Sequence, residues 1–163
     1  MTKQVLLAMI AYYRGDARRI NHFLKVYGFA QAIGAGEKLD ETTQEILEIA
    51  ALTHDLGIQN SEAKYGSSVG VYQQTEGPPE AEKLLRALQA EEAVIQRVCW
   101  LIAHHHTYKD IEGADYQILV EADFLVNAYE DSLSAEAIGA FERKVFQTKT
   151  GKALLKALYG DPE

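Results

Sequence analysis

Apolar residues recur along most of the chain at the spacing of a helix. Val26, Phe29 and Ile33 lie 4, 7 and 11 residues after His22, so they share one helical face with it. We find no run of alternating apolar and polar residues joined by a hairpin signal, as strands would need. With only 3 prolines and 12 glycines in 163 residues, long helices are easily accommodated. The pattern therefore predicts an all-α fold.

Glycines and capping residues divide this pattern into separate helices. Gly15 interrupts the first helix, and Asp16 is placed to cap the second. Gly34 and Gly36 are stop signals at the end of that second helix. We expect helices at about residues 3–14, 16–34, 40–57, 78–88, 91–106, 115–129, 134–147 and 150–159.

The segment 58–77 has weak periodicity and contains several glycines and serines. We predict a long loop there, with one helical turn at most, and expect it to shape a pocket. Pro78 and Pro79 would then lie in the first turn of the following helix, where proline is tolerated.

Charge and composition exclude some classes of protein. The formal net charge of −8 disfavours a grip on duplex nucleic acid, which needs clustered lysine and arginine. A small anionic substrate stays open, because a bound metal can invert the local potential. The apolar run at residues 5–13 is too short to span a membrane. The single cysteine, Cys99, suits a reducing compartment. We therefore expect a cytoplasmic protein without a membrane segment.

Three polar residues fall on the apolar faces of three different helices. They are His22, His54 and Asp123, the last of which shares its face with Leu119 and Val126. A buried carboxylate without a partner is unfavourable, and a metal ion would offset that cost. Taken alone, a histidine on an apolar face is more often a hydrogen-bonded core residue than a ligand, and Asp123 alone could be a buried acid bonded to tyrosine or backbone groups.

The local sequences around these residues resemble a known family. Arg19-x-x-His22-x-x-x-Val26, the adjacent pair His54-Asp55 and Glu121-Ala122-Asp123 closely resemble the HD-domain superfamily of metal-dependent phosphohydrolases. The resemblance implies one HD-type helical domain over residues 1–163, with a motif core at about 18–130 and C-terminal helices at 131–160. It also implies a divalent metal ion held by His22, His54, Asp55 and Asp123. A mixed nitrogen and oxygen ligand set suits Mn, Fe, Co, Ni, Zn or Mg and does not choose among them.

A second ion is a separate question, because relatives with two ions carry further histidines between the His-Asp pair and the last aspartate. His104, His105 and His106 lie in that region. Consecutive helical residues point about 100° apart, so only one of them, His104 or His105, would face the site as a ligand or catalytic group. A fortuitous cluster at a helix end is the alternative.

Gln73 takes the place where such relatives have another ligand histidine, and glutamine is a poor ligand. Glu76 could substitute for it, or could be a surface carboxylate at a helix start. We therefore expect one ion per chain.

The resemblance implies hydrolysis of a phosphate ester, with a nucleotide or a related small metabolite as substrate. Arg19 and Lys64 are candidates to bind its phosphate. The main alternative is a sensor module that binds metal and nucleotide without turnover. An oxidative di-iron protein of the same fold and a purely structural helical protein are further alternatives, and a homodimer stays open.

Overall fold

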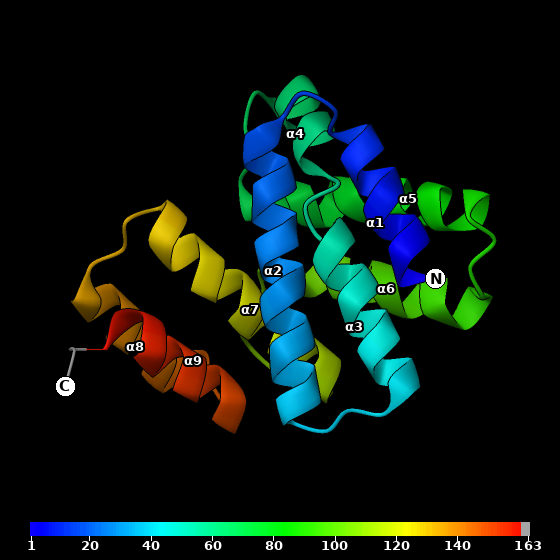
Figure 1. The fold of residues 1–163 in the computed structure, drawn as a ribbon. Coiled ribbons are helices and arrows are strands. Elements are labelled where there is room, and N and C mark those ends of the chain that lie inside the picture. The colour runs from blue at the N-terminus through cyan, green and yellow to red at the C-terminus, as the bar shows by residue number, and fades with distance from the viewer. Residues whose placement is uncertain (161–163) are drawn as a thin grey trace.

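The computed structural model describes residues 1–160, in which it has nine helices and no strand (Figure 1). The helices are α1 (Thr2–Tyr12), α2 (Ala17–Gly36), α3 (Glu41–Thr53), α4 (Ile58–Tyr65), α5 (Gly70–Ala87), α6 (Glu92–His104), α7 (Ala114–Glu130), α8 (Ala135–Val145) and α9 (Lys149–Tyr159). The predicted all-α fold is therefore confirmed.

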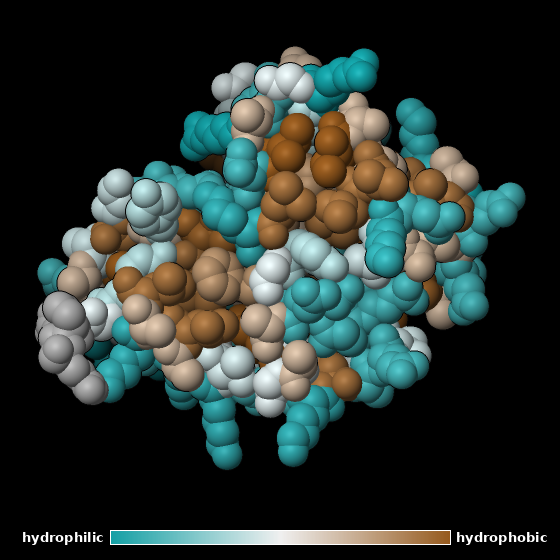
Figure 2. All heavy atoms as spheres, viewed as in Figure 1, coloured by the Kyte–Doolittle hydropathy of each residue, from teal (hydrophilic) through white to brown (hydrophobic). Residues whose placement is uncertain are grey.

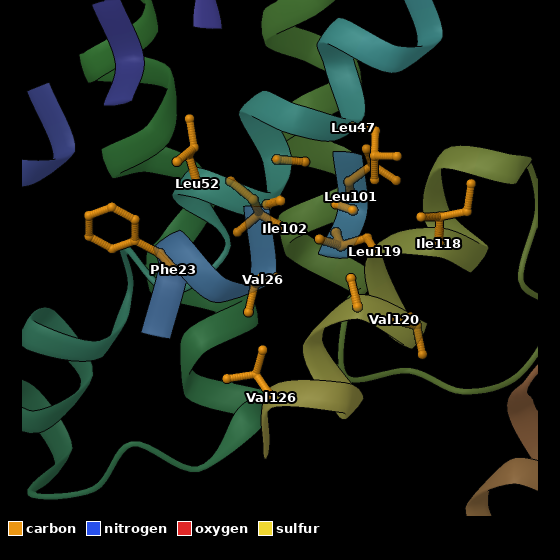
Figure 3. Close-up of a cluster of buried hydrophobic side chains, with 14 of the residues drawn as sticks. Phe23, Val26, Leu47, Leu52, Leu101, Ile102, Ile118, Leu119, Val120 and Val126 are labelled. Carbon is orange, nitrogen blue, oxygen red and sulfur yellow. The ribbon is translucent and has the colours of Figure 1, made fainter. Parts of the chain in front are cut away.

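The core forms where α2, α3, α6 and α7 meet. α2 packs on α3 and α7, while α3 also packs on α6 and α7. Figure 3 shows Phe23 of α2, Leu52 of α3 and Ile102 of α6 among the buried side chains of this junction. α7 is buried on nearly all sides, which is typical of a central helix. A polar side chain on the inward face of any of these helices is consequently removed from water.

Capping side chains mark the start of α2 and α3, the two helices that lead to the His-Asp pair. The Asp16 side chain accepts a hydrogen bond from the backbone of Arg19, so the predicted cap of α2 is confirmed. Asp40 caps α3 in the same way by accepting from the backbone of Thr43. The helices end earlier than predicted at two places that matter for the site. α3 ends at Thr53 and α6 ends at His104.

The prediction of a long loop at residues 58–77 is wrong. α4 occupies the first part of this segment, and the first eight residues of α5 occupy its last part. Pro78 and Pro79 lie inside α5 and not in its first turn. Proline removes a backbone donor, so local preference disfavours a helix that continues through both residues. Packing of α5 along α6 and α4 stabilises the helix in spite of this preference.

Two glycines allow the backbones of α4 and α5 to approach closely beside the His-Asp pair. A methyl group on Gly57 would lie 2.6 Å from the backbone nitrogen of Gly77 and 2.7 Å from the carbonyl oxygen of Gln73. Neither glycine has a positive φ, so close packing is the reason for their small size.

A buried carboxylate ties the C-terminal helices to α7. Glu121 is fully buried, and its Oε1 accepts hydrogen bonds from the backbone of Gln147 at 2.7 Å and of Thr148 at 3.0 Å. The Thr148 hydroxyl donates to Oε2 of the same carboxylate. These bonds hold the start of α9 against the middle of α7.

The outer surface mixes charged and apolar side chains. Figure 2 shows apolar side chains gathered over α1 and near α7 and α9, with hydrophilic side chains between and around them. Among residues 1–160, no helix combines the length and the apolar character needed to cross a membrane.

Candidate metal centre

Four of the predicted site residues converge at the junction of α2, α3 and α7. His22 lies in the second turn of α2, His54 directly follows α3, Asp55 is the next residue, and Asp123 lies in the middle of α7. The Nε2 atoms of His22 and His54 are 3.2 Å apart, and each lies 3.4 Å from Oδ1 of Asp123. Oδ2 of Asp55 lies 3.4 Å from Nε2 of His22 and 3.5 Å from Nε2 of His54.

These side chains are removed from water to different degrees. His54 is fully buried, while His22 and Asp123 are 8% and 5% exposed. Their inward orientation follows the helical phasing of the sequence. Asp55 is half-buried and lines a cavity that opens beside the cluster.

The cluster holds positive charge strongly. Burial alone would lower the pKa of His54, but Asp55 and Asp123 raise it to about 9. The pKa of His22 is likewise raised, because hydrogen bonding to Asp123 and the charge of Asp55 outweigh burial and the repulsion of His54. Burial would raise the pKa of Asp123, yet its hydrogen bonds to His22 and His54 hold it well below the usual value. The two carboxylates thus favour positive charge at this position. Without a metal ion, protons on the imidazoles supply that charge.

The spacing and chemistry of the four residues fit a divalent ion. Ligand atoms about 2.0–2.2 Å from a tetrahedral ion lie about 3.3–3.6 Å from one another. Five of the six donor–donor distances among these residues run from 3.2 to 3.5 Å. Two imidazole nitrogens and two carboxylate oxygens are ligands that first-row divalent metals accept.

A second group of donors adjoins the first. Asp55, His105 and His106 each bring one donor atom to within 4.8 Å of the other two. His105 is fully buried, and its Nε2 lies 3.9 Å from Oδ1 of Asp55 without a hydrogen-bond partner in the described chain. Burial, together with the neighbouring His106 and His54, lowers the pKa of His105 to about 3. Its imidazole is therefore neutral at physiological pH.

The three consecutive histidines do not act alike. His104 lies outside both groups, because it stacks on Trp100 with ring centroids 4.2 Å apart and its Nδ1 donates to the Trp100 carbonyl oxygen at 2.6 Å. His105 and His106 both face Asp55. The sequence reasoning named His104 or His105 and missed His106, for which the sequence carries no separate signal.

The cavity beside these groups has a volume of about 530 Å³ and is lined mostly by polar side chains. Arg19 lies in its wall, with its guanidinium paired to Asp16 at 2.7 Å and to Glu62 at 2.8 Å. Gln73 also lines the cavity, and its Oε1 accepts a hydrogen bond from His106 at 3.2 Å. Arg18 adds a second guanidinium to the wall.

Lys64 and Glu76 are not brought to the site. Within residues 1–160 neither lines the cavity, and they form an ion pair with each other at 2.5 Å. The Tyr65 hydroxyl donates to the second oxygen of Glu76 at 2.9 Å. The expected phosphate contact of Lys64 and the expected substitution of Glu76 for a ligand therefore have no support in this arrangement.

Two residues of α7 that the sequence reasoning missed support the cluster. The Asn127 side chain donates to Oδ1 of Asp123 at 2.9 Å, and Oε2 of Glu130 lies 2.9 Å from Nδ1 of His22. Both follow Asp123 at +4 and +7, which places them on its helical face. This spacing is the signal that could have found them.

The fold is all-α, and buried imidazoles and carboxylates at a helical junction form groups that could hold a metal ion. The profile of the HD domain family matches residues 19–143, so the chain belongs to that family, whose members are usually metal-dependent hydrolases. The resemblance seen in the sequence is confirmed.

A solved structure of similar fold supports the architecture. It is a crystal structure at 1.45 Å resolution, described as a predicted HD superfamily hydrolase, from an uncultured Thermotogales bacterium. The TM-score is 0.67 at 23% sequence identity, and the match covers 96% of this chain and 84% of that one. At this identity the similarity supports the fold alone. No curated protein matches the chain.

Proposed function

We propose that this protein is a metal-dependent phosphohydrolase that cleaves a phosphate ester of a small metabolite, with nucleotides as the first substrate class to test. The observation that carries the proposal is the convergence of His22, His54, Asp55 and Asp123 beside a cavity of about 530 Å³. These four residues would hold the ion. A divalent ion bound there supplies a Lewis acid that polarises a phosphoryl oxygen and lowers the pKa of water.

The cavity wall supports an anionic substrate once a cation is present. Arg18 and Arg19 are the guanidinium groups in the wall, whereas Asp16, Glu62 and Asp131 are carboxylates there. The carboxylates would repel a phosphate unless a metal offsets them. Arg19 is held by Asp16 and Glu62, so its guanidinium is already oriented and can share its donors with a phosphate oxygen.

His105 presents a lone pair to the site and not a proton. Its Nδ1 lies 2.7 Å from the Ile102 carbonyl oxygen, which can only accept, so Nδ1 carries the proton. The buried Nε2 consequently presents a lone pair toward Asp55. In the proposed enzyme this atom can bind a cation, whereas its burial and its pKa of about 3 make it a poor acceptor of a proton from water.

We keep one ion per chain as the proposed stoichiometry, because Gln73 replaces a donor in the second group. The pairing of Gln73 with His106 occupies one nitrogen of that imidazole. The convergence of Asp55, His105 and His106, with the unpartnered Nε2 of His105, favours a second ion. The identity of the metal follows from neither group.

The proposal is tested by hydrolysis assays on the metal-free protein reconstituted separately with Mg²⁺, Mn²⁺, Fe²⁺, Co²⁺, Ni²⁺ or Zn²⁺. The substrates are nucleoside mono-, di- and triphosphates, cyclic nucleotides and phosphorylated sugars, with the released phosphate or nucleoside monophosphate measured. We expect turnover with at least one metal, and its loss together with metal binding in Asp123→Ala.

The outcomes separate the alternatives. Tight binding of a nucleotide without product over hours would instead support the sensor module. If both His54→Ala and Asp123→Ala bound metal with the wild-type affinity, the proposed metal site and the proposed enzyme activity would both be refuted.

A further inference from the structure

The imidazoles of this site are oriented by hydrogen bonds at Nδ1. In His54 and His105 the acceptor is a carbonyl group at the end of a helix. His54 and His105 directly follow the last residues of α3 and α6. The last carbonyl groups of a helix have no partner within the helix. Nδ1 of His54 donates to Ala51 O at 2.9 Å, and Nδ1 of His105 donates to Ile102 O at 2.7 Å. Each ring therefore turns its Nε2 into the site.

His22 lies inside α2, which continues to Gly36, so no helix end places a free carbonyl group beside it. The hydrogen-bond partner of its Nδ1 is a side chain of another helix. Glu130, the last residue of α7 and 108 residues away in sequence, places Oε2 at 2.9 Å from Nδ1 of His22.

We propose that Glu130 is a positioning residue of the metal centre, which fixes the ring of His22 so that Nε2 points at the position shared with His54, Asp55 and Asp123. The inference rests on the proposed metal site and deepens it. A carboxylate that accepts from Nδ1 holds the proton on that atom and leaves the lone pair on Nε2. Acceptors of this kind orient ligand histidines and make them more basic.

The surroundings of Glu130 fit this role. Its side chain is only 17% exposed, and Lys25 binds the second carboxylate oxygen, so both oxygens are fixed. Lys25 lies on α2, one helical turn after His22, and the ion pair therefore holds Glu130 toward the same helix. Lys25 also offsets the charge that Glu130 adds to a site already containing two carboxylates.

The face of α7 extends the same support to a second residue of the site. Asp123, Asn127 and Glu130 follow one another at +4 and +3 on one side of the helix. Asn127 donates to the Asp123 carboxylate, and Glu130 accepts from the His22 imidazole. Asn127 and Glu130 thus fix one carboxylate and one imidazole of the cluster from a single rigid helix.

The experiment measures the affinity of the metal-free protein for Zn²⁺ and Co²⁺ by competition with a chromophoric chelator. The variants are Glu130→Ala, Glu130→Gln and, as matched control, Asp131→Asn. Asp131 is the next residue, lines the same cavity and carries the same charge, yet its side chain makes no contact with an imidazole among residues 1–160. Thermal unfolding of each metal-free variant shows that it is folded.

We expect Glu130→Ala to weaken metal binding by about 10–100-fold, the range typical of losing such a partner. Glu130→Gln retains an oxygen that accepts from Nδ1, so it should recover most of the affinity. The metal affinity of Asp131→Asn should stay within about threefold of the wild type, because solvent and salt screen the charge of an exposed side chain.

A spectroscopic readout separates positioning from a loss of packing. In the Zn²⁺-loaded protein, the Nδ1 proton of His22 should exchange slowly with water in the wild type and in Glu130→Gln, and rapidly in Glu130→Ala. Equal affinities in Glu130→Ala and Asp131→Asn would overturn the role of Glu130 while leaving the metal site intact. Absence of metal binding by the wild type would overturn the metal site itself, and the role of Glu130 with it.

Discussion

Replacing Gly57 with alanine perturbs the contact between the His-Asp turn and α5. The new methyl group would lie 2.6 Å from the backbone nitrogen of Gly77, 2.7 Å from the carbonyl oxygen of Gln73 and 3.0 Å from the Gly77 Cα. All three atoms belong to the backbone, so no side chain can rotate away to make room. α5 and the turn that holds His54 and Asp55 must therefore move apart.

The expected cost is that of overpacking a close contact, about 1–3 kcal/mol. For a chain of this length 1 kcal/mol corresponds to about 3 °C in Tm, so the melting temperature should fall by about 3–9 °C. Gly28→Ala is the matched control, because Gly28 lies inside α2 and a methyl group there meets no atom within 4 Å. That substitution should stabilise the protein by about 0.5–1 kcal/mol through helix propensity alone.

Thermal unfolding followed by circular dichroism, in chelator so that no metal contributes, measures both variants against the wild type. Gly57→Ala should also bind metal more weakly, because Asp55 lies in the turn that is displaced. A Gly57→Ala protein that melts at or above the wild-type temperature would refute the close approach of α4 and α5 as described.

Three further predictions follow from the contacts around the site. Tyr13→Phe removes the hydrogen bond at 2.9 Å from the Tyr13 hydroxyl to the Asp55 carbonyl oxygen, and should cost about 1 kcal/mol in chemical denaturation; an unchanged midpoint would contradict it. Glu121→Ala removes the shared acceptor of two partly buried backbone donors, and should cost about 1–3 kcal/mol and speed amide exchange in the first turn of α9. If exchange there is unaltered, Glu121 does not hold α9. The chelator-treated protein should lose stability as pH rises through about 9, because the pKa of His54 is raised in the folded state and its contribution is complete only below about 6.5, the unfolded value. A melting temperature that is flat from pH 6.5 to 9.5 would show that His54 is not held as a cation.

Much of the cluster could be predicted because helical phasing is local information. His22 and Asp123 fall on apolar stripes of long helices, and such stripes face the core. Phasing alone does not identify a metal ligand, however, and the family resemblance supplied the chemistry. Assignment of the metal to these residues stays a prediction until an ion is observed.

The region after the His-Asp pair could not be predicted because long-range packing determines it. Residues 58–77 contain glycines and serines and lead into two prolines, so every local signal favours a loop. Packing against α6 overrides those signals, and it depends on Gly57 and Gly77 meeting across the fold. No local sequence pattern predicts the contact between these two glycines.

The histidine cluster shows a different limit. An angular separation of about 100° between consecutive residues holds only within a helix. α6 ends at His104, so the chain turns after that residue and both His105 and His106 face Asp55. Glu130 was missed for a related reason, because its partner on α2 is fixed by helix packing between residues 108 positions apart.

The central claim is that His22, His54, Asp55 and Asp123 together hold one divalent ion. A crystal structure of the metal-loaded protein, with anomalous data collected above and below the absorption edge of the metal, tests it most directly. We predict one anomalous peak per chain within about 2.0–2.3 Å of donor atoms from all four residues. A peak bound elsewhere, or an additional peak at Asp55, His105 and His106, would contradict that claim.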